Sequence, residues 1–148
     1  MEQKGSTLLK VASILMIIAG IVGAIGSILM GVFAGAASVA LQDPEIQQTM
    51  ADAGTNAGEV QSIFWIAAVI LVVSAVIEII AGAKGKKNWN NPAAAKTLMI
   101  WGIVCAVVSV IGNILFASSD GVSILNIVTG LVIPILYIIG TVQLKKQA

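Results

Sequence analysis

Four long stretches of the chain contain no charged residue, and they constrain its fold more than any other feature. They cover residues 11–41, 60–77, 97–119 and 121–144. A helix needs roughly 20 apolar residues to cross the hydrocarbon core of a bilayer, and each stretch is of that order. The chain is 58% hydrophobic and 10% charged, with a mean hydropathy of +1.02. Such a chain lacks the polar residues to cover itself in water, so the sequence predicts a polytopic membrane protein.

The predicted architecture is all-α: a four-transmembrane-helix bundle that forms a single membrane domain over residues 1–148. The spans cover approximately residues 8–41, 60–83, 97–117 and 122–144, with an external segment at 42–59 and a cytoplasmic loop at 84–96. The first uncharged stretch has 31 residues, which makes a helix of about 46 Å. We therefore expect this helix to tilt or to protrude from the bilayer.

The lysines indicate the orientation of the chain. If the chain crosses the bilayer four times, all eight lysines fall on one side: Lys4, Lys10, Lys84, Lys86, Lys87, Lys96, Lys145 and Lys146. The external segment carries four carboxylates and no lysine, and the turn at 118–121 carries only Asp120. The positive-inside rule then predicts a multi-pass protein of the cell membrane with both termini in the cytoplasm. The loop lysines, Lys84, Lys86, Lys87 and Lys96, are then topology signals; an alternative is that they bind lipid headgroups.

A cleaved signal peptide is a second interpretation of the first span. Lys4 and Lys10 would form its basic region, and Ser38-Val39-Ala40 loosely resembles a cleavage site. The apolar run is about twice the length of a signal-peptide core, which favours a retained span.

The two halves of the chain show a pattern of internal repetition. When Lys10 is aligned with Lys96, "IGSILMG" (25–31) lies on "IGNILFA" (111–117). Likewise "EIIAGAKGKK" (78–87) lies on "YIIGTVQLKK" (137–146) without a gap. This repeat predicts two helical hairpins in the same orientation, related by a pseudo-twofold axis along the membrane normal.

Small residues recur at helical spacing in spans 1 and 3, and small residues allow membrane helices to approach closely. We expect these two spans to pack against each other through Gly20, Gly23, Ser27, Gly31, Gly35, Ala106, Ser109 and Ala117, with Asn113 on the same face. Two alternatives remain. Gly31 and Gly35 form a small-xxx-small pair that could serve a homodimer, and glycine is common in membrane helices in general.

Few polar residues interrupt the spans. Asn113 and Asn126 are expected at similar depth across the tight hairpin of spans 3 and 4, where an interhelical hydrogen bond is the structural interpretation. Glu78 is the one carboxylate within a predicted span; it could anchor to headgroups, pair with Lys10 or Lys96, or contact Tyr137. These four residues, Glu78, Tyr137, Asn113 and Asn126, are the candidate intramembrane polar site, because ionisable groups in a membrane are often functional.

Other single residues have simpler interpretations. Pro134 lies near the middle of span 4 and is expected to kink it. Trp65, Trp101 and Tyr137 fit interfacial aromatic belts. Cys105 is expected to be inert packing, since a lone cysteine within an apolar run can form no intrachain disulfide.

The external segment predicts a short amphipathic helix. Asp43 can cap it, with Pro44 at its first position and Glu45 near its positive end. Ile46, Met50 and Ala53 then share a face, and Gly54 can end the helix. The carboxylates match no calcium loop, so a solvated acidic surface is expected.

The glycine-rich first span and the inner loop "KKNWNNPAAAKTL" (86–98) give a resemblance that covers the whole chain. In composition the chain resembles small uncharacterised four-helix integral membrane proteins of Gram-positive bacteria. That resemblance implies no activity and transfers no functional residue. Small multidrug transporters also have four spans, but their membrane carboxylate lies in the first span, where this chain has none.

An enzyme is not expected. The chain has no histidine and no arginine, and it contains no nucleophile–base pair, metal cluster or phosphate loop; we expect no cofactor, no metal and no nucleic-acid partner. The leading hypothesis is a non-catalytic membrane protein that acts through protein–protein contacts, as an accessory subunit or an immunity-type protector. The alternatives are a small transporter or channel with a path near Glu78, Asn113 and Asn126, and a lipid-binding protein that uses the lysine loop.

Overall fold

The structure, a computed structural model, describes residues 4–115 and 124–147. Within these residues it is entirely helical. The elements are α1 (Lys4–Ala40), α2 (Pro44–Asp52), α3 (Ala57–Lys87), a short 3₁₀ helix η1 (Pro92–Ala94), α4 (Ala95–Leu115) and α5 (Ile124–Lys145). Four of them are long and apolar enough to cross a membrane. The predicted all-α fold with four spans is therefore confirmed.

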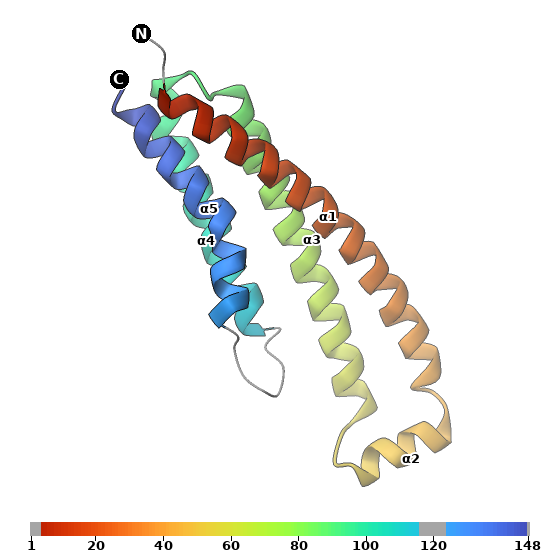
Figure 1. Cartoon of the computed structure of the whole chain (residues 1–148). Coiled ribbons are helices and arrows are strands. Elements are labelled where there is room, and N and C mark those ends of the chain that lie inside the picture. The colour runs from red at the N-terminus through yellow and green to blue at the C-terminus, as the bar shows by residue number, and fades with distance from the viewer. Residues whose placement is uncertain (1–3, 116–123, 148) are drawn as a thin grey trace.

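The four long helices form two hairpins that point the same way. The α1–α3 hairpin contains α2 in its connection, and α4 packs with α5 in the second hairpin. Between the hairpins, α1 contacts α5 and α3 contacts α4. Both termini and the turn that contains η1 lie at one end of the molecule, and α2 lies at the other (Figure 1). We refer to these as the lysine end and the acidic end.

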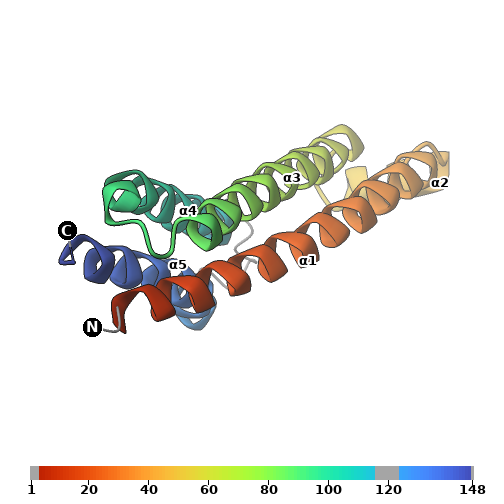
Figure 2. The ribbon, with the colours of Figure 1, turned by 90° about the horizontal axis from the view of Figure 1, so that it is seen from above.

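The two hairpins differ in length. Helices α1 and α3 have 37 and 31 residues, whereas α4 and α5 have 21 and 22. At 1.5 Å per residue, these lengths are about 55 and 46 Å against about 32 and 33 Å. The α1–α3 hairpin therefore continues beyond the other pair, as two perpendicular views show (Figures 1 and 2). We call residues 25–71 of this hairpin, with α2, the distal segment.

The core lies at the lysine end, where all four long helices meet. The side chain of Tyr137 is its largest fully buried member. The buried cluster comprises Leu9, Ala12, Met16, Ala81, Ala95, Leu98, Cys105, Tyr137 and Leu144. The prediction that Cys105 packs in the interior is confirmed, since it is only 1% exposed.

Helices α1 and α3 meet along small residues repeated every seven positions. On α1 the buried positions Ser13, Gly20, Ser27 and Ala34 follow this spacing, and on α3 Ala68, Ala75 and Gly82 do the same. A seven-residue repeat keeps one stripe facing the partner helix over a long antiparallel contact. A Cβ built at Gly82 would lie 2.7 Å from the backbone oxygen of Ser13, so the two backbones touch there.

The prediction that spans 1 and 3 pack tightly together is wrong for the described residues. Helix α1 packs on α3 and α5, and α4 packs on α5 and α3, so α1 and α4 lie across the bundle from each other. Gly20 and Gly23 instead face Ala75 of α3, and Ser27 donates to the backbone of Ala24 in its own helix. Gly31 and Gly35 have no atom within 4 Å of a built Cβ.

The partner residues predicted in span 3 do not form that contact either. Ala106 and Ser109 are half-buried in α4, and Ala117 lies outside the described residues. A small side chain leaves room for a neighbouring helix to approach closely. It does not show which helix approaches, and here α3 does so.

Two local predictions concern single prolines. Pro44 begins α2 behind the N-cap Asp43, whose side chain accepts a hydrogen bond from the Glu45 amide at 2.9 Å. Gly54 follows the helix with φ of 72°, the left-handed conformation that ends helices. The capped helix is thus confirmed, although none of its residues is buried.

Pro134 lies buried inside α5, which continues on both sides of it; its kink stays a prediction.

Candidate functional site

Tyr137 joins α5 to α3 in the centre of the core. Its hydroxyl donates a hydrogen bond to the backbone oxygen of Ala81 at 2.8 Å. Two glycines make room for its ring, because a Cβ at Gly85 or Gly102 would come within 2.6 or 2.9 Å of ring carbons. The prediction of Tyr137 as an interfacial anchor is wrong, since the side chain is fully buried. Residues from α3 and α4 enclose it, and the sequence of span 4 does not reveal them.

Glu78 is half-buried on α3, one turn before Ala81. The hydroxyl of Tyr137 binds Ala81, and the ammonium of Lys10 lies over the ring of Trp89. Those two groups, which were predicted as partners of Glu78, are therefore engaged elsewhere.

The two asparagines are not part of one site with Glu78. Asn113 follows Cys105 by eight residues, or about 12 Å along α4. Its amide donates to the backbone oxygen of Ser109 at 2.8 Å and lies beside Gly130 of α5. Asn126 is exposed on α5. The predicted interhelical hydrogen bond between the asparagines is thus replaced by a bond within α4.

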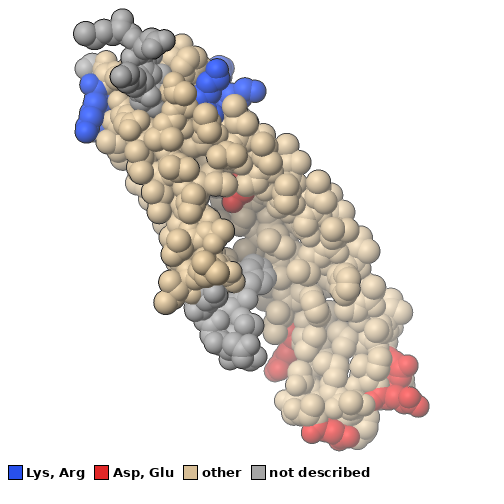
Figure 3. Space-filling model, in the orientation of Figure 1, with Lys and Arg blue, Asp and Glu red and all other residues tan. Residues whose placement is uncertain are grey.

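The lysine end carries an exposed basic surface (Figure 3). Lys84, Lys86 and Lys87 lie in the last turn of α3, where positive charge is favoured by the helix dipole. Two lysines lie over tryptophan rings: Lys10 over Trp89 at 4.8 Å, and Lys84 over Trp101 at 5.7 Å from the ring centres. These cation–π pairs are typical stabilising contacts near a surface. Lys96, Lys145 and Lys146 are also exposed.

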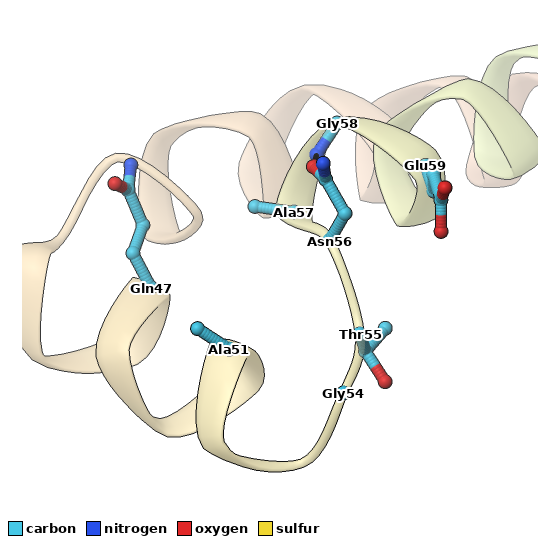
Figure 4. A pocket seen from close by; sticks show the side chains of 8 residues that line it. All are labelled: Gln47, Ala51, Gly54, Thr55, Asn56, Ala57, Gly58 and Glu59. Atoms are coloured by element: carbon cyan, nitrogen blue, oxygen red, sulfur yellow. Dashed lines mark hydrogen bonds between the residues drawn. The ribbon is translucent and has the colours of Figure 1, made fainter.

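The acidic end has the opposite charge. Its carboxylates are all exposed, and Figure 3 shows acidic groups gathered at that end: Asp43, Glu45, Asp52 and Glu59. Beside them, the connection between α2 and α3 borders an open hollow of about 570 Å³. Gln47, Asn56 and Glu59 contribute polar groups to its lining (Figure 4). The Asn56 side chain also caps α3 by accepting a hydrogen bond from the Gly58 amide at 2.8 Å.

The distal segment exposes apolar side chains that the shorter hairpin does not reach. Ala81 is buried on the side of α3 that faces the core. Ile63 lies on the same side of α3, because it comes 18 residues, or five full turns, earlier. Its side chain is nevertheless 64% exposed. On α1 the exposed fractions of Ile28, Val32 and Phe33 are 67%, 66% and 70%. This side of the α1–α3 hairpin therefore lacks a protein neighbour over the distal segment, among the residues described.

The described residues contain no group of three or more His, Cys, Asp or Glu side chains that could hold a metal ion. Comparison with known proteins gives one family. The model of a family described as "Protein of unknown function (DUF4064)" matches residues 9–108, which run from α1 into α4. No curated protein and no solved structure matches the chain significantly.

Proposed function

We propose that this chain, which belongs to the DUF4064 family of unknown function, is a non-catalytic membrane protein that acts by binding another protein through its distal segment. One observation carries the proposal. On one side, the distal half of the long hairpin has no other helix of the described chain packed against it, although its exposed side chains there are large and apolar. Outside the hydrocarbon core of the bilayer, an apolar surface bordered by polar residues is typical of an interaction site.

Packing at the lysine end supports the same proposal. Four helices close there around Tyr137, and glycines bring the backbones into contact. A transport path would require polar groups around a connected wet cavity. Glu78 and the asparagines are instead separated along their helices. The distal segment projects from this closed end (Figure 1).

Site-specific photo-crosslinking in the native membrane tests the proposal. A photoreactive residue at Val32 or Ile66 would report on the distal segment, where these side chains are 66% and 58% exposed. The matched controls are Ile18 and Ile135 near the lysine end, 53% and 47% exposed. We expect one protein to be captured stoichiometrically from the distal positions and not from the controls. Lipid adducts alone at all four positions would overturn the proposal.

The cellular setting belongs to the same proposal. We assign the protein to the cell membrane of a Gram-positive bacterium, with both termini in the cytoplasm. The separation of charge supports this orientation, because the described lysines gather at the end with the termini and the carboxylates of residues 43–59 at the other (Figure 3). The acidic end then faces the outside of the cell, where an accessory or protective protein would meet its partner.

A second candidate function is a small transporter, favoured by one observation. Glu78 is half-buried in a spanning helix, and intramembrane carboxylates often mark ion or proton paths. Reconstituted liposomes test it: cation or proton flux above that of empty vesicles, abolished by Glu78→Gln, would support transport. Flux equal to that of empty vesicles would remove this candidate and leave the interaction proposal standing.

A further inference from the structure

We infer that the partner of the distal segment is a cationic amphipathic helix that lies at the acidic end of the protein. This inference rests on the proposed function and adds the chemistry of the partner. It combines two independent features of the distal segment, its charge and its uncovered apolar surface.

The charge of the distal segment is of one sign. Between residues 25 and 71 the chain carries four carboxylates and no lysine, and all four are exposed. A second copy of the chain packed here in the same orientation would bring eight carboxylates together. Like charges oppose that pairing, whereas a basic partner is drawn to the same surface. Charge therefore favours a cationic partner over a homodimer.

The apolar surface begins within about one helical turn of the carboxylates. Val39 precedes Asp43 by four residues and Ile63 follows Glu59 by four, and these two side chains are 71% and 64% exposed. Glu59 and Ile63 both lie in α3, where four residues correspond to about 6 Å, and Val39 and Asp43 flank the end of α1 at Ala40. A partner that covers both surfaces needs an apolar face and a basic face on one short element. An amphipathic helix with lysine or arginine on its polar face has this arrangement, and such helices lie at membrane surfaces.

The structure also gives the partner a place beside the protein. The shorter hairpin packs against α3 near the lysine end and does not extend along the distal segment (Figures 1 and 2). A helix bound at the acidic end would lie at the membrane surface, beside the part of α1 and α3 that the shorter hairpin leaves uncovered (Figure 1).

Two synthetic peptides test the inference. The first is an 18-residue amphipathic helix of leucine and lysine, and the second is its twin with glutamate in place of each lysine; both carry a fluorophore. Binding is measured by fluorescence anisotropy on the full-length protein in phosphatidylcholine nanodiscs, with empty nanodiscs as background. We expect the lysine peptide to bind above background and the glutamate peptide to remain at background.

Matched variants locate the binding surface. The variant Asp43→Asn/Glu45→Gln/Asp52→Asn/Glu59→Gln keeps a capping side chain at position 43 and removes the negative charge. We expect it to bind the lysine peptide about tenfold more weakly, because each exposed ion pair contributes little and four act together. The control Lys86→Gln/Lys87→Gln/Lys145→Gln/Lys146→Gln removes four exposed charges from the other end and should bind within about twofold of the unmodified protein.

The outcomes separate this inference from the proposed function. Equal binding of both peptides, or no effect of the acidic variant, would overturn the cationic partner. A lysine peptide that binds only at the level of empty nanodiscs would show that lipid alone attracts it and would overturn the inference too. In either case, capture of a protein by crosslinks from Val32 and Ile66 would still support the proposed function. Capture of a second copy of the chain would support the interaction surface and replace the cationic partner.

Discussion

At the scale of the residue, the most informative position is Tyr137. A hydroxyl group buried in an apolar core needs a hydrogen-bond partner, and here it binds the backbone oxygen of Ala81 at 2.8 Å. The contact links α5 to α3 through two residues that are 56 positions apart in the sequence. Gly85 and Gly102 are required beside it, since any larger side chain would overlap the ring.

Tyr137→Phe should therefore lower the free energy of unfolding by about 1 kcal/mol, the usual range for an interhelical hydrogen bond in a membrane. The measurement is steric-trap or SDS-induced unfolding of the protein in bicelles. Thr129→Val is the control, because the Thr129 hydroxyl is exposed and binds Leu125 in its own helix. Equal losses in the two variants would contradict a special role for the Tyr137 hydroxyl.

At the scale of the element, the contact between α1 and α3 depends on where glycine occurs. Gly20 and Gly82 lie at points of close approach, and Gly31 and Gly35 lie on the same hairpin where a Cβ would meet nothing within 4 Å. In a membrane, helix association relies on close van der Waals packing and not on the removal of apolar surface from water. Glycines of the same hairpin thus contribute differently to stability: Gly20 and Gly82 allow the two helices to pack closely, whereas Gly31 and Gly35 make no such contact.

Gly82→Ala should destabilise the protein by about 2 kcal/mol, because the new Cβ would lie 2.7 Å from the Ser13 backbone oxygen and 3.0 Å from the Ile17 amide nitrogen. Gly35→Ala should be neutral or should stabilise by up to about 1 kcal/mol, because alanine favours helix and the space is open. Both effects are measured as unfolding free energies in bicelles. Destabilisation by Gly35→Ala would instead indicate that this face is covered, and comparison of dilute and concentrated protein would show whether a second copy covers it.

At the scale of the whole molecule, charge and length are distributed unevenly. One end combines the termini, the described lysines and a closed core. The other end combines α2, the carboxylates of residues 43–59 and uncovered apolar side chains (Figures 1 and 3). The helices of the short hairpin, at about 32 Å, match the hydrocarbon thickness of a bilayer, and those of the long hairpin exceed it. The long hairpin must then tilt, protrude or be covered.

Cysteine labelling should show the acidic end outside the cell. In a Cys105→Ala background, Thr55→Cys should react with a membrane-impermeant maleimide in intact cells, and Asn90→Cys should react only after permeabilisation. Both positions are exposed, so a difference in labelling reports the side of the membrane. The reverse pattern would place the lysine end outside and would remove the basis for an extracellular partner.

Sequence alone determined what depends on near neighbours along the chain. Asp43, Pro44 and Gly54 specify the beginning and end of α2 within a dozen residues, and uncharged stretches of sufficient length specify four spanning helices. The internal repeat stays a prediction, although the described helices contact one another in the ring that a pseudo-twofold arrangement would give.

Tertiary structure decided which helices became neighbours. Spans 1 and 3 share small residues, yet α1 packs on α3, because contact depends on how two entire surfaces fit together. The seven-residue spacing of Ser13, Gly20, Ser27 and Ala34 was present in the sequence, but its meaning required the matching stripe of Ala68, Ala75 and Gly82 on the partner. Burial of Tyr137 and exposure of the distal segment have the same origin. Both follow from the way in which two hairpins of different length pack together, which no local pattern encodes.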